Sequence, residues 1–82
     1  MIEWEYMHVE VFNHRVIKID NEMVADTKYK DMAYKVDAYN LELVASDFLR
    51  EAGHEGWEVA GMCSASEDGK NWRMILKRSI SE

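Results

Sequence analysis

The strongest constraint on the fold is a one-sided helix that ends at a pair of glycines and leads directly into an aromatic strand. Apolar side chains recur with the spacing of a helix that buries one face: Leu41, Val44, Ala45, Phe48, Leu49 and Ala52. Asn40 is a suitable N-cap, and Gly53 can supply the left-handed residue that ends a helix. Gly56 permits a chain reversal, and Trp57 begins a β-prone run. We therefore predict a helix over residues 41–52 and a structural joint made of Gly53, Gly56 and Trp57.

The N-terminal segment predicts a hairpin whose first strand is apolar on both sides. Residues 4–12 alternate between two apolar sets: Trp4, Tyr6 and Phe12 on one side, Met7, Val9 and Val11 on the other. Asn13-His14 can form a tight turn, after which residues 15–19 return and pair Val11 with Val16. A strand that is apolar on both sides is usually buried on both sides. Because one helix covers one face only, we expect the face with Trp4, Tyr6 and Phe12 to be an oligomer interface.

The C-terminal third predicts a second hairpin. Residues 57–65 and 71–78 are β-prone, and Asp68-Gly69 is a signal for a two-residue turn at the tip. This turn would pair Ala65 with Trp72, Cys63 with Met74, and Gly61 with Leu76. These residues would share the core face with Trp57 and Val59. Glu58, Ser64, Arg73 and Lys77 would lie on the opposite face.

The whole chain predicts one small domain. Its 82 residues suffice for a single domain over 1–82. We expect an α+β fold, with an antiparallel sheet of about four strands in the order β-β-α-β-β and one main helix packed on one face. Residues 20–30 fit either a short strand around residues 23–24 or a polar loop. We expect residues 26–37 to be the least regular part, although Met32, Val36 and Tyr39 have helical spacing.

Three short motifs resemble the small bacterial and phage DUF4177 domains. They are the start Trp4-Glu5-Tyr6, the block Gly53-x-x-Gly56-Trp57-Glu58-Val59 and the ending Ile75-Leu76-Lys77-Arg78. The resemblance covers most of the chain outside residues 15–39, and it implies a small α+β domain with one helix against an antiparallel sheet. Met7-His8 departs from the Lys-Val that the family usually has there. The family has no assigned activity, so the resemblance implies no function.

Charge and composition exclude several classes of partner. The net charge is −6, whereas a surface that binds phosphates needs a basic excess, so nucleic-acid binding is disfavoured. No apolar run approaches the roughly 20 residues that span a bilayer, and the acidic start lacks the features of a signal peptide. The single cysteine, Cys63, excludes an internal disulfide and fits a reducing compartment. We expect a cytoplasmic protein without a membrane partner.

The residues that could carry chemistry form no known catalytic or metal-binding pattern. His8, His14, His54 and Cys63 lack the paired spacing of zinc ligands. His54-Glu55 could be an acid–base pair, but nothing nearby predicts a pocket for it, and Cys63 is expected in the core, where a thiol is inert. We therefore predict no catalytic residue, no metal, no cofactor and no enzymatic activity.

The basic residues cluster near the C-terminus and allow two interpretations. Lys70, Arg73, Lys77 and Arg78 can be the charges that guard an edge strand against aggregation, and Glu58 can reach Lys77 or Arg78 across the hairpin. Alternatively, Arg73, Lys77 and Arg78 can form an anion or nucleotide site in which Trp72 or Tyr6 stacks on a base. The first interpretation fits the acidic chain better.

Three hypotheses for function follow. The first is a non-catalytic interaction module that self-associates through its sheet into a dimer or larger homo-oligomer. The second is a protein that binds or sequesters a small anionic or nucleotide-like ligand. The third is an acidic inhibitor of the kind that phages direct against a host system.

Overall fold

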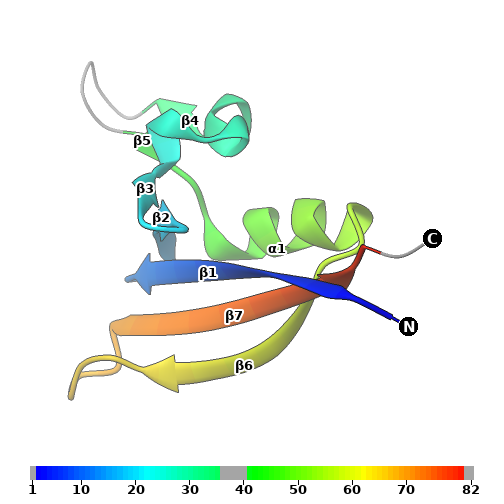
Figure 1. Ribbon diagram of the computed structural model, residues 1–82. Helices are drawn as coiled ribbons and strands as arrows, with labels where there is room; N and C mark the ends of the chain where they lie inside the picture. Colours follow the sequence, from blue (N-terminus) through cyan, green and yellow to red (C-terminus); the bar gives the residue numbers. More distant parts are fainter. Residues whose placement is uncertain (1, 36–40, 81–82) are drawn as a thin grey trace.

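Among the described residues, the fold consists of an antiparallel sheet, one α-helix, and a segment of short strands and 3-10 helices over residues 22–42. The computed structural model describes residues 2–35 and 41–80 (Figure 1). The elements in chain order are β1 (Trp4–Phe12), β2 (Arg15–Ile19), β3 (Glu22–Met23), the 3-10 helices η1 (Val24–Asp26) and η2 (Lys28–Met32), β4 (Tyr34–Lys35), β5 (Leu41–Glu42), α1 (Ala45–His54), β6 (Glu58–Ser64) and β7 (Asn71–Ser79). The main sheet has five strands in the order β3-β2-β1-β7-β6, and β4 and β5 form a two-stranded sheet.

The predicted α+β class is confirmed, and the predicted strand number is too low. β1, β2, β6 and β7 correspond to the four strands expected from the sequence, and β3 adds a short fifth strand beside β2. The first and last strands of the chain pair over their whole length, from Trp4 opposite Ser79 to Phe12 opposite Asn71. This pairing places β7 inside the sheet and leaves β6 at its edge.

The β1–β2 hairpin forms as predicted. Asn13 and His14 both have positive φ, 50° and 70°, as a two-residue turn that matches the twist of the strands requires. Val11 pairs with Val16, and a bulge after Glu10 leaves Ile17 without a partner on β1. Local turn chemistry is sufficient to fix this register.

The predicted start of the helix is wrong. α1 begins at Ala45, and Leu41–Glu42 is a strand. The backbone before the helix is bound to the first hairpin: Val16 N–H donates to the Leu43 carbonyl (2.8 Å), and Ala45 N–H donates to the His14 carbonyl (2.9 Å). These long-range bonds hold the chain extended, so Leu43, which lies off the helical stripe, becomes buried. The proposed cap, Asn40, lies outside the described residues, as do Val36 and Tyr39.

The helix ends at His54, and the left-handed residue that follows it is Gly56 and not Gly53. Gly53 is helical, whereas Gly56 has φ of 94°. Trp57 N–H donates to the Ala52 carbonyl and Gly56 N–H to the Gly53 carbonyl, both at 3.0 Å, which is the paired C-terminal capping pattern with a left-handed glycine. Gly56 therefore makes the reversal, as predicted, and the left-handed role predicted for Gly53 is wrong.

The register of the β6–β7 hairpin also differs from the prediction. Met62 lies opposite Met74, Cys63 opposite Arg73 and Ser64 opposite Trp72, with an irregularity between Val59 and Gly61. Asp68 and Gly69 lie in a turn within a longer loop, where the Asp68 carboxylate accepts hydrogen bonds from the Ser66 hydroxyl and the Lys70 N–H. The longer loop shifts the pairing of residues 61–64 by one residue relative to the prediction. Their side chains therefore point to the face opposite to the predicted one.

One buried cluster contains side chains of both α1 and the sheet. Phe48 and Ala52 of α1 are completely buried. The cluster also contains side chains of β1, β2, β7, both 3-10 helices, the first residue of α1 and the segment just before it: Met7, Val9, Val11, Val16, Ile19, Val24, Tyr29, Leu43, Ala45, Met74 and Leu76. The Phe48 ring meets the Tyr29 ring edge-on, with 5.0 Å between centroids. Tyr29 belongs to η2, so the segment predicted to be least regular, residues 26–37, supplies part of the core.

Candidate interaction surface

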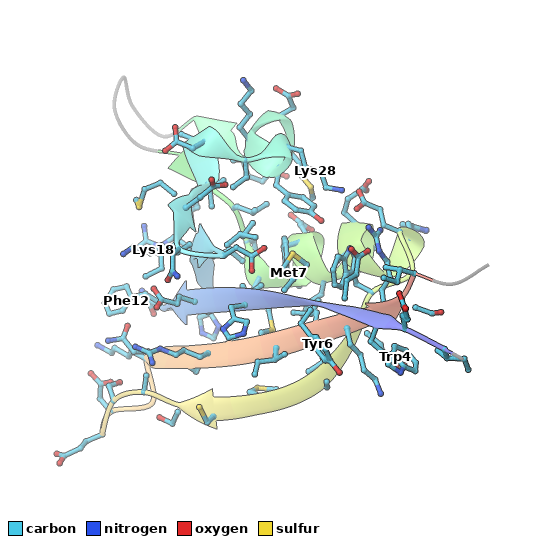
Figure 2. All side chains as sticks on the ribbon, in the orientation of Figure 1. Trp4, Tyr6, Met7, Phe12, Lys18 and Lys28 are labelled. Carbon is cyan, nitrogen blue, oxygen red and sulfur yellow. The ribbon has the colours of Figure 1, made fainter. Side chains whose placement is uncertain are left out.

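The face of the sheet that points away from the core is rich in exposed apolar side chains. Along β1, Met7, Val9 and Val11 are buried, whereas Trp4, Tyr6 and Phe12 are 42%, 58% and 37% exposed. Figure 2 shows Met7 on the side of β1 that faces α1, with Tyr6 and Trp4 on the other side. On β7, the exposed Ile75 lies opposite His8 and so belongs to the same side as Tyr6. We call the surface formed by Trp4, Tyr6, Phe12 and Ile75 the open face.

The cations on the open face are paired with carboxylates of the same chain. Lys77 Nζ lies 3.6 Å from Glu58 Oε1 and 4.5 Å from the centre of the Trp4 ring. Arg73 Nε lies 3.6 Å from Glu10 Oε1. Exposed pairs of this kind contribute about 0–1 kcal/mol each to stability. Their main effect here is that the charges of Lys77 and Arg73 on the open face are balanced within the chain.

A shallow depression of about 500 Å³ lies over the middle of the sheet. Gly61 lies opposite Ile75 and has no side chain to fill the space beside it. The depression is bordered by an imidazole, a thiol and the Arg73–Glu10 pair, and its lining includes His8, Glu10, Gly61, Cys63, Arg73 and Ile75. Among the described residues, no group of three or more His, Cys, Asp or Glu side chains is arranged to hold a metal ion.

The proposed anion patch does not form a single cluster. Strand alternation places Arg73 and Lys77 on the open face, whereas Trp72 and Arg78 lie on the side of the buried Met74 and Leu76. The basic residues also do not guard an edge, because β7 lies between β1 and β6. The sequence could not show this, since the neighbours of β7 are set by long-range pairing.

Arg78 joins the two chain ends to the C-terminus of the helix. Its guanidinium forms an ion pair with Glu5, donates from Nη1 to the Glu55 carbonyl (3.1 Å) and lies 4.5 Å from the centre of the Trp57 ring. A cation at the last carbonyls of a helix also interacts favourably with the helix dipole. Arg78 and Trp57 therefore have a structural role, which agrees with the structural joint predicted from the sequence.

Glu55 is also held in place by neighbouring side chains. Its Oε2 accepts hydrogen bonds from Lys28 Nζ (2.7 Å) and from the Tyr29 hydroxyl (3.3 Å). Burial, and then the negative charge of Glu55, raise the pKa of Tyr29 to about 12. The hydrogen bond from Lys28 lowers the pKa of Glu55. These shifts keep Tyr29 protonated and Glu55 ionised near neutral pH, so the pair does not exchange a proton there.

The outer strand β6 was misplaced by sequence reasoning. The prediction put Val59 and Cys63 in the core, but every residue of β6 is exposed. The sequence feature that indicates an exposed strand is the small size of Ala60, Gly61 and Ser64. Such side chains bury little apolar area, so they would contribute little stability to a strand in the core.

Comparisons of the chain with models of protein families, with curated proteins and with solved structures find no match. Within the described parts of the chain, no helix is both long enough and apolar enough to cross a bilayer. We therefore infer function from the surface of the sheet itself.

Proposed function

We propose that this protein is a non-catalytic interaction module that self-associates through the open face of its sheet. The observation that supports the proposal most directly is the exposure of Trp4, Tyr6 and Phe12 along a single strand. We infer that α1 covers the opposite side of the sheet, which carries the buried Met7, Val9 and Val11. Among the described residues, the aromatic side then has no cover.

The chemistry of the open face suits contact with a protein surface. Aromatic side chains are enriched at the centres of protein interfaces, because they bury a large area while losing few rotatable bonds. Burying apolar surface contributes about 25 cal/mol per Å². The cations Lys77 and Arg73 already have carboxylate partners within the chain, so a second copy can cover them without supplying opposite charges.

Light scattering during size-exclusion chromatography tests the proposal. We expect the wild-type protein to be larger than one chain and the variant Tyr6→Glu to have a lower mass. Tyr34→Glu is the matched control, because Tyr34 is as exposed as Tyr6 but lies on β4 outside the main sheet. A wild-type monomer at high concentration, with its tryptophans shielded from a soluble quencher, contradicts the proposal.

A second candidate function is binding of a small anionic ligand in the depression over Gly61. The exposed Arg73 guanidinium at its border is the observation that favours it. Titration with inorganic phosphate, followed by the NMR signals of Arg73 and His8, tests this candidate. Unmoved signals at millimolar phosphate exclude it.

We also infer a cytoplasmic setting, because Cys63 is an exposed free thiol and such thiols persist in reducing compartments.

A further inference from the structure

The outer edge of β6 is the longer of the two edges of the sheet. β6 is the last strand in the order β3-β2-β1-β7-β6, and all seven of its residues are exposed. In Figure 1 it is the yellow strand at the lower margin, on the far side of β7 from β1. A strand at an edge presents a row of unpaired N–H and C=O groups to any chain that can pair with it.

The two edges of the sheet differ in how they are protected. Natural sheets protect their edges with short strands, lysines, prolines or bulges. The opposite edge, β3, is two residues long. β6 contains no lysine and no proline, and its one irregularity lies between Val59 and Gly61, near its beginning. Residues 61–64 therefore form a regular edge that is open to pairing.

Two large apolar side chains of β6 lie beside the core without a cover. Val59 pairs with the buried Leu76, and Met62 pairs with the buried Met74, so both point to the side of the sheet that carries the core. They are nevertheless 42% and 63% exposed. A further strand with its own apolar side chains beside β6 would cover both.

We propose that β6 pairs antiparallel with β6 of a second copy, so that two sheets become one continuous sheet. The charge on the strand favours a second copy as the occupant. Glu58 is the only charged residue of β6 and stands at its first position. In a two-fold antiparallel arrangement the two Glu58 side chains lie at opposite ends of the junction, so they do not repel each other across it.

The same symmetry brings the apolar residues together. Among the registers that keep every side chain on its own face, the one centred on residue 62 places Met62 of one copy directly opposite Met62 of the other, and those centred on residues 61 and 63 place the two diagonally. The contact is self-complementary, as a two-fold interface requires. Edge pairing goes beyond the proposed contact through the open face and does not depend on it.

The two contacts together predict a dimer of dimers. A two-fold axis perpendicular to the sheet leaves the open faces of both copies on the same side. Two such extended sheets can then stack through their open faces, which gives a closed tetramer with two kinds of interface.

Mass determination on five proteins separates the two contacts. We expect the wild-type protein to have about four times the mass of one chain, and Met62→Glu and Tyr6→Glu each to have about half of the wild-type mass. The double variant should be a monomer. Tyr34→Glu is again the control, because Tyr34 is exposed and lies on β4 outside the main sheet; it should keep the wild-type mass.

The outcomes distinguish failure of one contact from failure of the other. If Met62→Glu keeps the wild-type mass while Tyr6→Glu lowers it, edge pairing is wrong and the open-face contact stands. If Met62→Glu lowers the mass and Tyr6→Glu does not, the reverse holds.

Hydrogen exchange on the unmodified protein adds a test without substitution. Along residues 61–64, every second N–H points away from β7. We expect those outward amides to be protected only at high protein concentration, and exchange that is independent of concentration overturns edge pairing.

Discussion

Two glycines three residues apart should respond to alanine with opposite signs. Gly53 is helical, and a Cβ added to it would meet no atom within 4 Å. Gly56 has φ of 94°, and a Cβ there would lie 3.7 Å from Arg78 Cδ, an ordinary contact. Space is therefore available at both positions, and only the backbone conformation differs.

The magnitudes follow from that difference. Alanine is favoured over glycine by about 0.8–1.0 kcal/mol inside a helix, and near the helix end we expect Gly53→Ala to raise the free energy of unfolding by about 0.5 kcal/mol. A left-handed backbone costs a residue with a Cβ roughly 1–2 kcal/mol, so Gly56→Ala should lower the free energy of unfolding by about that amount. The two variants should differ by about 2 kcal/mol.

Urea denaturation followed by tryptophan fluorescence measures both changes. With a slope of roughly 1 kcal/mol per molar urea, the midpoint should rise by about 0.5 M for Gly53→Ala and fall by about 1–2 M for Gly56→Ala. Protein concentration must be equal throughout, because self-association stabilises the folded state. Gly69→Ala is a second left-handed site with free space, and its midpoint should also fall. A fall for Gly53→Ala equal to that for Gly56→Ala would refute the reasoning.

Three further results are expected from the side chains described above. The folded pKa of Tyr29 is about 12, whereas an unfolded tyrosine has a pKa of about 10. The free energy of unfolding should therefore fall as pH rises from 10 to 12, and Tyr29→Phe should flatten this dependence. Glu55→Gln should lower the pKa of Tyr29 in an ultraviolet titration. Arg78→Met should lower the free energy of unfolding by about 1–2 kcal/mol, because it removes a half-buried hydrogen bond to the Glu55 carbonyl and an ion pair. Arg73→Met, which removes one exposed pair, should change it by less than about 0.5 kcal/mol, and equal effects would contradict the role given to Arg78. Cys63→Ser should leave the free energy of unfolding within about 0.5 kcal/mol of wild type, since the thiol is exposed, and a loss of several times that would place Cys63 in the core after all.

Features set by neighbouring residues could be predicted from the sequence. The Asn13-His14 turn and the pairing of Val11 with Val16 follow from local turn chemistry and alternation. The burial of Phe48 and Ala52 follows from helical spacing. The exposure of Trp4, Tyr6 and Phe12 follows from the two apolar faces of their strand, because one helix can cover only one of these faces.

Features set by distant residues could not be predicted. The helix begins at Ala45 because the His14 carbonyl and the Val16 N–H bind the chain just before it, and periodicity carries no information about such partners. The register of β6 depends on an irregularity between Val59 and Gly61 and on the loop before β7, and beyond that irregularity a shift of one residue moves the side chains to the opposite face.

The sequence by itself determined the class of the fold, one helical face, the first hairpin and the aromatic strand, because each depends on side chains a few positions apart. Tertiary structure decided which strand stands at the edge. β7 pairs with β1 over its full length and so occupies the interior of the sheet, where its arginines and lysine find carboxylates. β6 is left at the margin with its outer edge unpaired and Met62 exposed, because β1 occupies the other side of β7 and no described strand of the main sheet lies beyond β6.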